Sequence, residues 1–313
     1  MTEPAPANRY DVMVVGEYYY DLIFTDLPTL PRLGTDIWAS SFDDLPGASY
    51  TTALALTRLG LKAGWWCGFG TDIFSRMVLD EVRREGIDEG LFQWHDGPLR
   101  RVSAAFSFQQ DRGFISYVDE HDRDPTAEDV EAAQPLVLML QGFSRSAERL
   151  ALISGARRNG VLVCGECQHL DFGIEAEGVV DVLQALDMFV PNESEAIQFS
   201  GAADAEAALD VLERHVPTVV IKRGANGAIA SHEGRRYAVP APKVEVVDTT
   251  GAGDSFNAGL IYGVLRGAPF EEALRYAVIC GSLSTTDYGG RALPREADLL
   301  ARVSQDGKEK HAR

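Results

Sequence analysis

Residues 246–259 read Val-Val-Asp-Thr-Thr-Gly-Ala-Gly-Asp-Ser-Phe-Asn-Ala-Gly, a β-branched pair followed by a glycine-rich turn. Apolar residues then recur at helical spacing, which predicts a strand, a tight loop and a helix over 256–265. Gly251 and Gly253 allow the backbone to approach a ligand closely. The free N–H groups and the positive dipole end of the helix point at the same loop. The stretch therefore predicts an anion-binding loop.

Asp254 stands directly beside this loop. The positive end of the helix stabilises its carboxylate, which next to a bound phosphate can accept a proton from an attacking hydroxyl. The alternative is an ordinary capping Asp at a helix start. Two glycines and two carboxylates, Asp248 and Asp254, coincide with the strand-to-helix switch, and this favours the catalytic interpretation.

Outward from this stretch, short apolar runs alternate with helix-like segments for most of the chain, which is the α/β pattern. The nearly continuous apolar character of the runs predicts strands buried on both faces of a parallel sheet. The expected strands are 11–16, 136–140, 161–164, 188–190 and 219–222. The expected helices are 51–59, 74–85, 147–158, 179–186, 205–215, 256–265 and 270–285.

Two segments instead alternate with a period of two, which suits a sheet with one exposed face. The first is 18–42, including an alternating run at 36–40. The second pairs 102–108 with 114–118 across a turn at 109–113, as in a hairpin. We expect a small β-unit in the N-terminal half.

Composition restricts the class of partner. The 313 residues include 47 acidic and 29 basic side chains, a formal net charge of −18 that repels nucleic acid and anionic membranes. The start lacks the parts of a signal peptide, no apolar run is long enough to span a bilayer, and the four cysteines suit a reducing compartment. We expect a cytoplasmic protein with a small-molecule ligand.

The 246–259 string resembles the C-terminal signature of the PfkB/ribokinase family of carbohydrate kinases, close to DTxGAGDxFxxG. The matching positions are Asp248, Thr250, Gly251, Ala252, Gly253, Asp254, Phe256 and Gly259. The resemblance implies a ribokinase-like, doubly wound three-layer α/β/α domain with a small β-sheet lid. It places one kinase domain at 9–303, with lid segments at about 18–42 and 100–120 and flexible tails at 1–8 and 304–313.

The resemblance also implies an ATP-dependent kinase that uses Mg²⁺ and phosphorylates a hydroxyl of a small sugar or sugar acid. Asp254 would be the base, and the N–H groups of Gly251, Ala252 and Gly253 would hold the transferring phosphate. The chain has no G-x-x-x-x-G-K-[ST] string, so a P-loop is excluded.

The nucleotide side is implied by two further motifs. Asn192 and Glu195 match the family's N-x-x-E and would hold Mg²⁺ through ordered waters; alternatively they only cap a helix. Lys222-Arg223-Gly224-Ala225-Asn226-Gly227 resembles the K-x-G-x-x-G loop. Lys222, Gly224 and Gly227, together with Thr249, would line the ATP site; the alternative is that Lys222 is a surface lysine at a strand end.

A monovalent cation, K⁺, is a further candidate that follows from the resemblance alone. Asp248 and Thr250 match the family positions for it, and the backbone near Ser284 and Gly289 would complete the cage.

At the acceptor end, Asp21 matches a position where the family binds sugar hydroxyls; the alternative is a solvated loop Asp. Gly47 and Thr51 fall in the segment corresponding to G-G-x-x-x-N-x-A. Here Pro46 replaces the first glycine and Thr51 replaces the asparagine. The sugar contact must therefore differ, and the identity of the acceptor stays open.

Two other acceptor classes stay open behind a sugar or sugar acid. A nucleoside is the second choice, because the tyrosines at 18–20 could stack on a base. A sugar phosphate ranks third, since the lid segments offer only scattered arginines. A different function is also open, namely an inactive sugar-binding or regulatory protein that has kept the fold.

Aromatic side chains crowd the expected lid, and we favour sheet packing or a lid-to-lid homodimer contact for them. They are Tyr18, Tyr19, Tyr20, Trp38, Phe106, Phe108, Phe114 and Tyr117.

Cys164, Cys167 and His169 form a C-x-x-C-x-H string. No second ligand pair stands at a zinc-ribbon spacing, so two free thiols at a strand end are favoured over a metal site.

Overall fold

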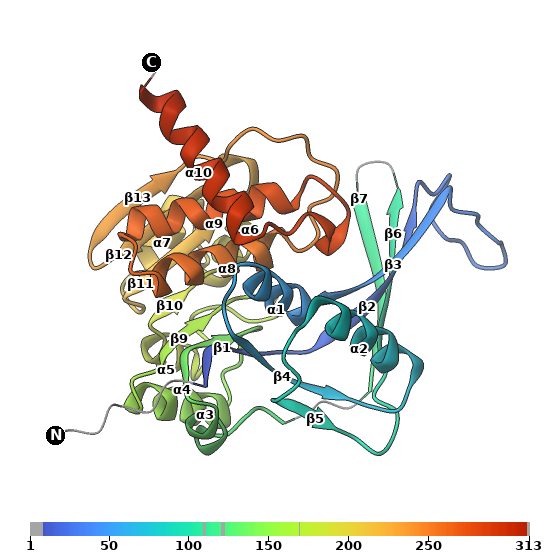
Figure 1. Ribbon diagram of the computed structural model, residues 1–313, viewed down its shortest axis with the longest axis horizontal. Helices are drawn as coiled ribbons and strands as arrows, with labels where there is room; N and C mark the ends of the chain where they lie inside the picture. The colour runs from blue at the N-terminus through green and yellow to red at the C-terminus, as the bar shows by residue number, and fades with distance from the viewer. Residues whose placement is uncertain (1–8, 109–110, 120–122, 169, 312–313) are drawn as a thin grey trace.

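Two β-sheets of different size organise the chain in the computed structural model, which describes residues 9–108, 111–119, 123–168 and 170–311. The larger sheet has the strand order β13-β12-β11-β10-β9-β8-β1-β4-β5, and the smaller has the order β3-β2-β6-β7. In Figure 1 the smaller sheet stands at the right of the body that contains the larger one. The expected tail at 1–8 lies outside the described residues.

The larger sheet is parallel except for the β11-β12-β13 edge, which is antiparallel. From β1 the chain winds outward in both directions, to β4 and β5 on one side and to β8 through β11 on the other. This is the expected doubly wound arrangement, with its switch point between β1 and β8. The strands are β1 (Tyr10–Val15), β4 (Ala63–Phe69), β5 (Phe92–Trp94), β8 (Pro135–Leu140), β9 (Leu162–Gly165), β10 (Met188–Phe189), β11 (Thr218–Lys222), β12 (Ala228–His232) and β13 (Arg235–Val239).

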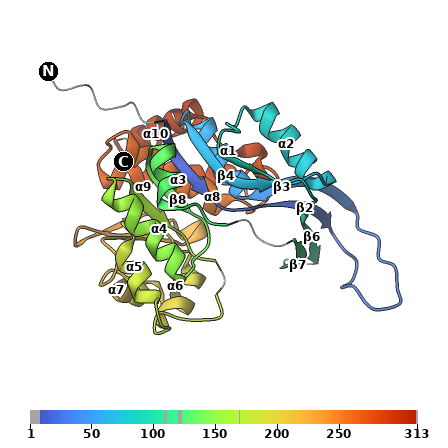
Figure 2. The same cartoon turned by 90° about the horizontal axis from the view of Figure 1, so that it is seen from below.

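Helices cover both faces of this sheet, as Figure 2 shows. Side chains along a strand alternate between the faces, so Val12 and Val14 of β1 join one apolar cluster while Met13 and Val15 join the other. The first cluster packs against α1 (Ser49–Arg58), α2 (Ile73–Glu85), α8 (Ala252–Leu265), α9 (Phe270–Ser284) and α10 (Glu296–His311). The second packs against α3 (Ala127–Ala133), α4 (Ala147–Arg158), α5 (Val179–Ala185), α6 (Glu193–Ser200) and α7 (Ala205–Leu212).

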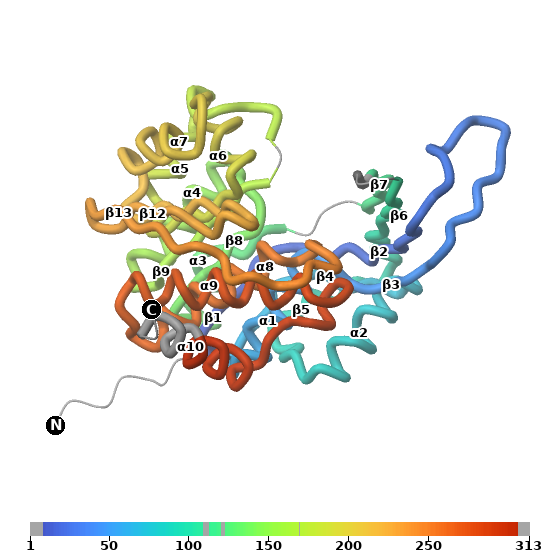
Figure 3. The backbone as a smooth tube through the Cα atoms, turned by 90° about the horizontal axis from the view of Figure 1, so that it is seen from above, coloured from blue at the N-terminus to red at the C-terminus, as the bar shows by residue number. Residues whose placement is uncertain are grey.

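The smaller sheet is the expected lid. It contains β2 (Tyr18–Thr25), β3 (Ser41–Ala48), β6 (Arg101–Phe108) and β7 (Asp111–Val118). Tyr18 stacks on Phe69 of the body with ring centroids 5.2 Å apart, and Tyr20 lies 6.2 Å from Phe74. The loop at 26–40 projects away from the body (Figure 3).

Several local expectations were wrong. Residues 246–247 form no strand, and their side chains are largely exposed, so a β-branched pair was insufficient evidence. Residues 36–40 are not a strand either; the partner of β2 comes later, at β3. The hairpin turn is shorter than 109–113 because β7 begins at Asp111, and residues 109–110 lie outside the description.

Element ends also differ. Strand β10 stops at Phe189 and helix α7 at Leu212, whereas α8 begins at Ala252, four residues before the expected start. The expected tail from 304 continues helix α10 as far as His311. Among the described helices, none combines the length and the apolar character needed to cross a bilayer.

Candidate active site

The glycine loop closes directly onto helix α8. Gly251 is its N-cap residue with φ 75°, a left-handed conformation that favours glycine. A Cβ at Gly251 would lie 2.7 Å from Cγ2 of Thr51, so the loop packs tightly against α1. The Ala252 N–H bonds the Thr249 carbonyl at 3.3 Å and is therefore already partly engaged in the turn.

Asp254 lies in the first turn of α8 and does not cap the helix. Its Oδ1 accepts hydrogen bonds from the Thr52 hydroxyl at 2.6 Å and from Gln141 Nε2 at 2.7 Å. Burial raises the pKa of this carboxyl, while the two hydrogen bonds and the charge of Lys222 oppose that shift. The structure thus excludes the capping alternative.

A cavity of about 780 Å³ opens in front of this turn. It brings together most of the residues expected on the nucleotide side, at the carboxyl ends of the strands where doubly wound sheets bind ligands. Those among its lining are Asn192, Glu195, Lys222, Gly224, Gly227, Thr249, Ala252, Gly253 and Asp254. Gly224 begins the 3-10 helix η1 (Gly224–Asn226), and Gly227 directly follows it.

Lys222 is not a surface lysine, since its side chain is only 14% exposed. Nζ lies 3.5 Å from Asn257 Oδ1 and 3.9 Å from Glu166 Oε2. It would also be 3.3 Å from a Cβ placed on Gly253, so this ammonium group lies directly beneath the glycine loop.

Asn192 and Glu195 do cap helix α6. The Asn192 side chain accepts the Glu195 N–H at 2.9 Å, and Glu195 Oε2 accepts the Asn192 N–H at 2.8 Å. Both residues also line the cavity, and burial raises the pKa of Glu195. Asn192 and Glu195 therefore cap the helix, as the alternative predicted, and they are also placed where they could bind Mg²⁺ beside the phosphates.

Sequence reasoning missed four polar residues that complete this site: Thr52, Gln141, Glu166 and Asn257. The Asn257 amide donates to Glu166 Oε2 at 2.5 Å, and burial raises the pKa of Glu166 to about 7. Glu166 lies inside the C-x-x-C-x-H string, in which the cysteines and the histidine form the recognisable pattern. Asn257 follows Asp254 by three residues, a spacing that puts both on one helix face.

On the acceptor side, Asp21 in β2 lies against Gly47 in β3. A Cβ on Gly47 would be 2.7 Å from Asp21 Oδ2, so the carboxylate occupies the space that glycine leaves. Burial raises the pKa of Asp21 to about 7, which is not the behaviour of a solvated loop Asp. Thr51 is buried and contacts Gly251, so the segment from Gly47 to Thr51 links Asp21 to the glycine loop.

The candidate cation residues converge only in part. Asp248 Oδ1 accepts from the backbone and hydroxyl of Thr250, and Oδ2 accepts from the Gly289 N–H at 3.0 Å. Gly289 begins η2 (Gly289–Ala292). The Ser284 hydroxyl bonds the Gly281 carbonyl, but the backbone next to Ser284 does reach Asp248, because the Thr285 carbonyl accepts the Asp248 N–H at 3.2 Å.

The cysteine string forms no metal centre in the part of the chain that is described. Cys164 and Cys167 are free and buried, and burial raises the pKa of each thiol to about 12. His169 lies outside the described residues. No group of three metal-binding side chains gathers within those residues.

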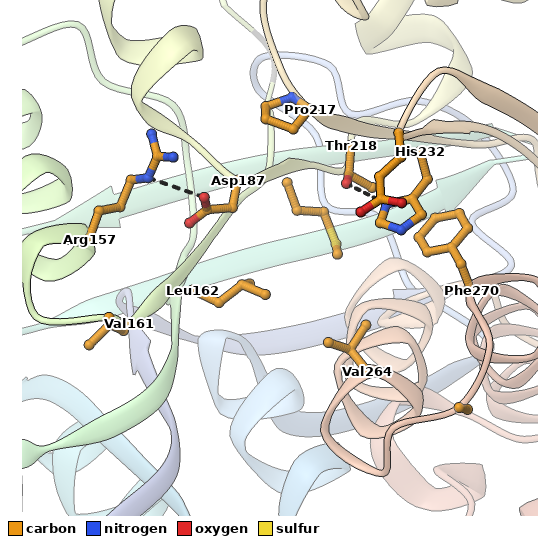
Figure 4. A pocket seen from close by; sticks show the side chains of 13 residues that line it. Arg157, Val161, Leu162, Asp187, Pro217, Thr218, His232, Val264 and Phe270 are labelled. Carbon is orange, nitrogen blue, oxygen red and sulfur yellow. Dashed lines mark hydrogen bonds and ion pairs between the residues drawn. The ribbon is translucent and has the colours of Figure 1, made fainter.

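A second cavity, of about 570 Å³, opens at the opposite edge of the sheet (Figure 4). It lies at the starts of β9, β10 and β11, where Thr218 bonds His232 at 2.9 Å and Arg157 pairs with Asp187 at 3.1 Å. It contains none of the expected site residues, so the first cavity is the candidate active site.

Comparisons with known proteins identify the family and the fold of the chain. Residues 10–297 match the protein family described as pfkB family carbohydrate kinase. The ribokinase of Haemophilus influenzae is 26% identical over 308 residues, covering 93% of this chain and 98% of that protein. A ribokinase of Arabidopsis thaliana complexed with ribose and ATP superposes with a TM-score of 0.79 at 21% identity, covering 93% of this chain and 98% of the other. An E. coli structure in complex with ATP and Mg²⁺ has a TM-score of 0.77 at 21% identity, covering 95% and 99%.

Proposed function

The chain belongs to the pfkB family of carbohydrate kinases, which are ATP-dependent phosphotransferases, and on that premise we propose that it phosphorylates a hydroxyl of a small nonphosphorylated sugar or sugar acid. The observation that carries this proposal is the position of Asp254. Its buried carboxylate lines the 780 Å³ cavity in the first turn of α8, beside a glycine loop and above Lys222.

In the proposed reaction, Asp254 accepts the proton of the attacking hydroxyl as the new O–P bond forms and the bond to ADP breaks. Gly251, Ala252 and Gly253 present the N-terminal end of α8 to the transferring phosphoryl group, whose charge the helix dipole stabilises. Lys222 adds a positive charge beneath the same loop.

The residues around Asn192 fit Mg²⁺. The helix cap uses Oε2 of Glu195, and no described residue bonds Oε1, so this carboxylate keeps an oxygen for a hydrated cation. When bound, Mg²⁺ neutralises charge on the phosphates of ATP. Glu195 and Asn192 would hold its water shell, and Thr249, Gly224 and Gly227 would border the nucleotide.

K⁺ is a further candidate, at Asp248, Thr250, Ser284 and Gly289. Asp248 accepts hydrogen bonds from the N–H groups of Thr250 and Gly289, and these bonds connect the glycine loop to η2. A cation bound at the same place would make this connection more rigid.

Asp21 supports a hydroxyl-rich acceptor, because an ionised carboxylate can accept two hydroxyl hydrogen bonds. Gly47 and Thr51 border the same region. The nucleoside alternative rested on stacking by the tyrosine run, yet Tyr18 and Tyr20 are buried against the body. We therefore keep a sugar or sugar acid as the leading acceptor.

Measuring ADP formation with a panel of sugars, sugar acids and nucleosides tests the function. With the best acceptor, Asp254→Asn is expected to lower kcat by roughly a hundredfold while the protein still binds ATP and unfolds at a similar temperature. Full activity in this variant would refute the assignment. Acceptor binding without any ADP formation by the unmodified chain would instead favour an inactive sugar-binding protein.

We also propose that the chain forms a homodimer through the lid. Strand β7 is an edge of the smaller sheet, and Phe114 and Ile115, on its two faces, are 61% and 68% exposed. An unpaired edge strand with apolar side chains is a template for pairing with a second copy.

A further inference from the structure

Three side chains from three different elements meet in a closed triangle at the proposed base. The Thr52 hydroxyl of α1 donates to Asp254 Oδ1 at 2.6 Å, and Gln141 Nε2, just after β8, donates to the same oxygen at 2.7 Å. Gln141 Nε2 lies 2.8 Å from the Thr52 hydroxyl as well. The positions are 89 to 202 residues apart in sequence, so only the fold brings them together.

The backbone fixes the place of Gln141. Its N–H donates to the Val15 carbonyl at 3.0 Å, at the switch point between β1 and β8. A Cβ on Gly16 would lie 2.9 Å from Gln141 Oε1, so glycine at this position makes room for the amide. With Oε1 against Gly16, the amide turns its donor group toward Asp254.

Both hydrogen bonds fall on one carboxylate oxygen. Among the described residues, no side chain donates to Asp254 Oδ2. A carboxylate tied at Oδ1 has a defined plane, and its second oxygen can accept a proton only from a group on the open side.

We propose that Thr52 and Gln141 are positioning residues that hold Oδ1 of Asp254 so that Oδ2 faces the acceptor hydroxyl. This rests on the proposed function, because it assumes that Asp254 is the base. Neither residue is assigned contact with the reacting atoms; both act through Asp254.

The surroundings of Asp254 give the proposal an electrostatic consequence. Lys222 of β11 favours the ionised form of Asp254, whereas burial and the nearby carboxylate Glu166, after β9, disfavour it. The donors Thr52 and Gln141 favour the ionised form too. Removing either donor should therefore raise the pKa of the base as well as loosen its orientation.

The test compares Thr52→Val, Thr52→Ser and Gln141→Met with the unmodified enzyme. Thr52→Val and Gln141→Met remove a donor, and each is expected to lower kcat by about tenfold, in line with the loss of a hydrogen bond to a charged group. The KM for ATP should stay unchanged, and the acidic limb of the kcat profile should move to higher pH. Thr52→Ser keeps the hydroxyl, so this variant should keep most of kcat and the acidic limb of the unmodified enzyme.

A matched control is Thr57→Val in the same helix, whose hydroxyl bonds the Ala53 carbonyl and no side chain among the described residues. It should leave kcat and the pH profile unchanged while reporting any general effect of the substitution on α1. Thermal unfolding of every variant identifies one that fails to fold. If Thr52→Val fails, Gln141→Met still carries the test, and if Gln141→Met fails, the comparison of Thr52→Val with Thr52→Ser carries it.

The outcomes separate the two proposals. If Asp254→Asn stops the reaction but Thr52→Val and Gln141→Met leave kcat and the acidic limb unchanged, the positioning role is wrong and the base stands. If Asp254→Asn remains active, the proposed function fails first.

Discussion

At the scale of single residues, the buried carboxylates decide how this site responds to pH. Asp21 has its pKa raised to about 7 by burial, with no compensating charge among the causes of the shift. Between about 4 and 7 the folded chain holds a proton on Asp21 that the unfolded chain has lost. The free energy of unfolding therefore falls as the pH rises through this window.

Asp21→Asn is expected to have opposite effects on stability and activity. It removes a charge that is costly to bury, so Tm should rise, and by more at pH 8 than at pH 5.5. In the proposed acceptor site, asparagine offers one acceptor oxygen where the carboxylate offers two, so the KM for the sugar should rise about tenfold or more while the KM for ATP is unchanged. Thermal unfolding and steady-state kinetics measure the two effects.

Asp36→Asn, in the exposed loop at 26–40, is the control and should change neither Tm nor KM. An unchanged sugar KM in Asp21→Asn would place the acceptor elsewhere.

At the scale of elements, two helix starts face the cavity and are built differently. Helix α8 begins at a glycine without a side-chain cap, which leaves its first turn open to a ligand. Helix α6 begins with a capping box between Asn192 and Glu195, so these side chains already satisfy two backbone N–H groups. The same pair can serve both structure and Mg²⁺ only if one carboxylate oxygen stays available.

Glu195→Gln separates the two roles, because glutamine also completes a capping box but carries no charge. Tm should change little, whereas the Mg²⁺ concentration needed for half-maximal rate should rise several-fold. The measurement is a Mg²⁺ titration at saturating ATP and sugar.

The matched control is Glu193→Gln in the same helix turn, which pairs with Arg223 outside the cap and should leave the titration unchanged. A loss of Tm in Glu195→Gln with an unchanged Mg²⁺ requirement would show a purely structural residue.

At the scale of the whole molecule, the lid is joined to the body yet keeps one edge unpaired. Fully buried Arg101 in β6 donates to the Gly68 carbonyl at 2.9 Å, and Asp43 in β3 pairs with Arg291 in η2. The far edge, β7, and the projecting loop remain outside these contacts (Figure 3). All four cysteines are free thiols.

The lid edge makes an oligomeric prediction. The unmodified chain should sediment at twice its 34.1 kDa mass, and Ile115→Lys should shift it toward the monomer, because a charge cannot be buried unpaired in an apolar interface. Sedimentation equilibrium at several concentrations measures this. Leu300→Lys, an exposed apolar position on α10, should leave the dimer intact. If the unmodified chain sediments as a monomer at all concentrations, the proposal of a lid dimer is wrong.

The amino-acid sequence alone predicts the α/β class, the parallel character of the central strands and the glycine loop before α8. These are local properties: apolar runs identify buried strands, and the motif around Asp254 lies within fourteen consecutive residues. It does not predict β4, because the strand contains two glycines and no β-branched residue, although all its residues are buried. It also predicts the second lid strand in the wrong place. Polar and apolar residues alternate at 36–40 as they do in a strand, but the segment that pairs with β2 is β3, which begins at Ser41.

The polar partners of the proposed base, Asp254, become visible only in the folded chain. Thr52 is adjacent to a motif position, Gln141 follows an ordinary strand, and Glu166 is hidden among cysteines, so none carries a local pattern that identifies it. They meet because parallel strands end at one edge of the sheet, where loops distant in sequence converge. The sequence gives the chemical type of each side chain, but the fold decides which side chains lie close enough to act together.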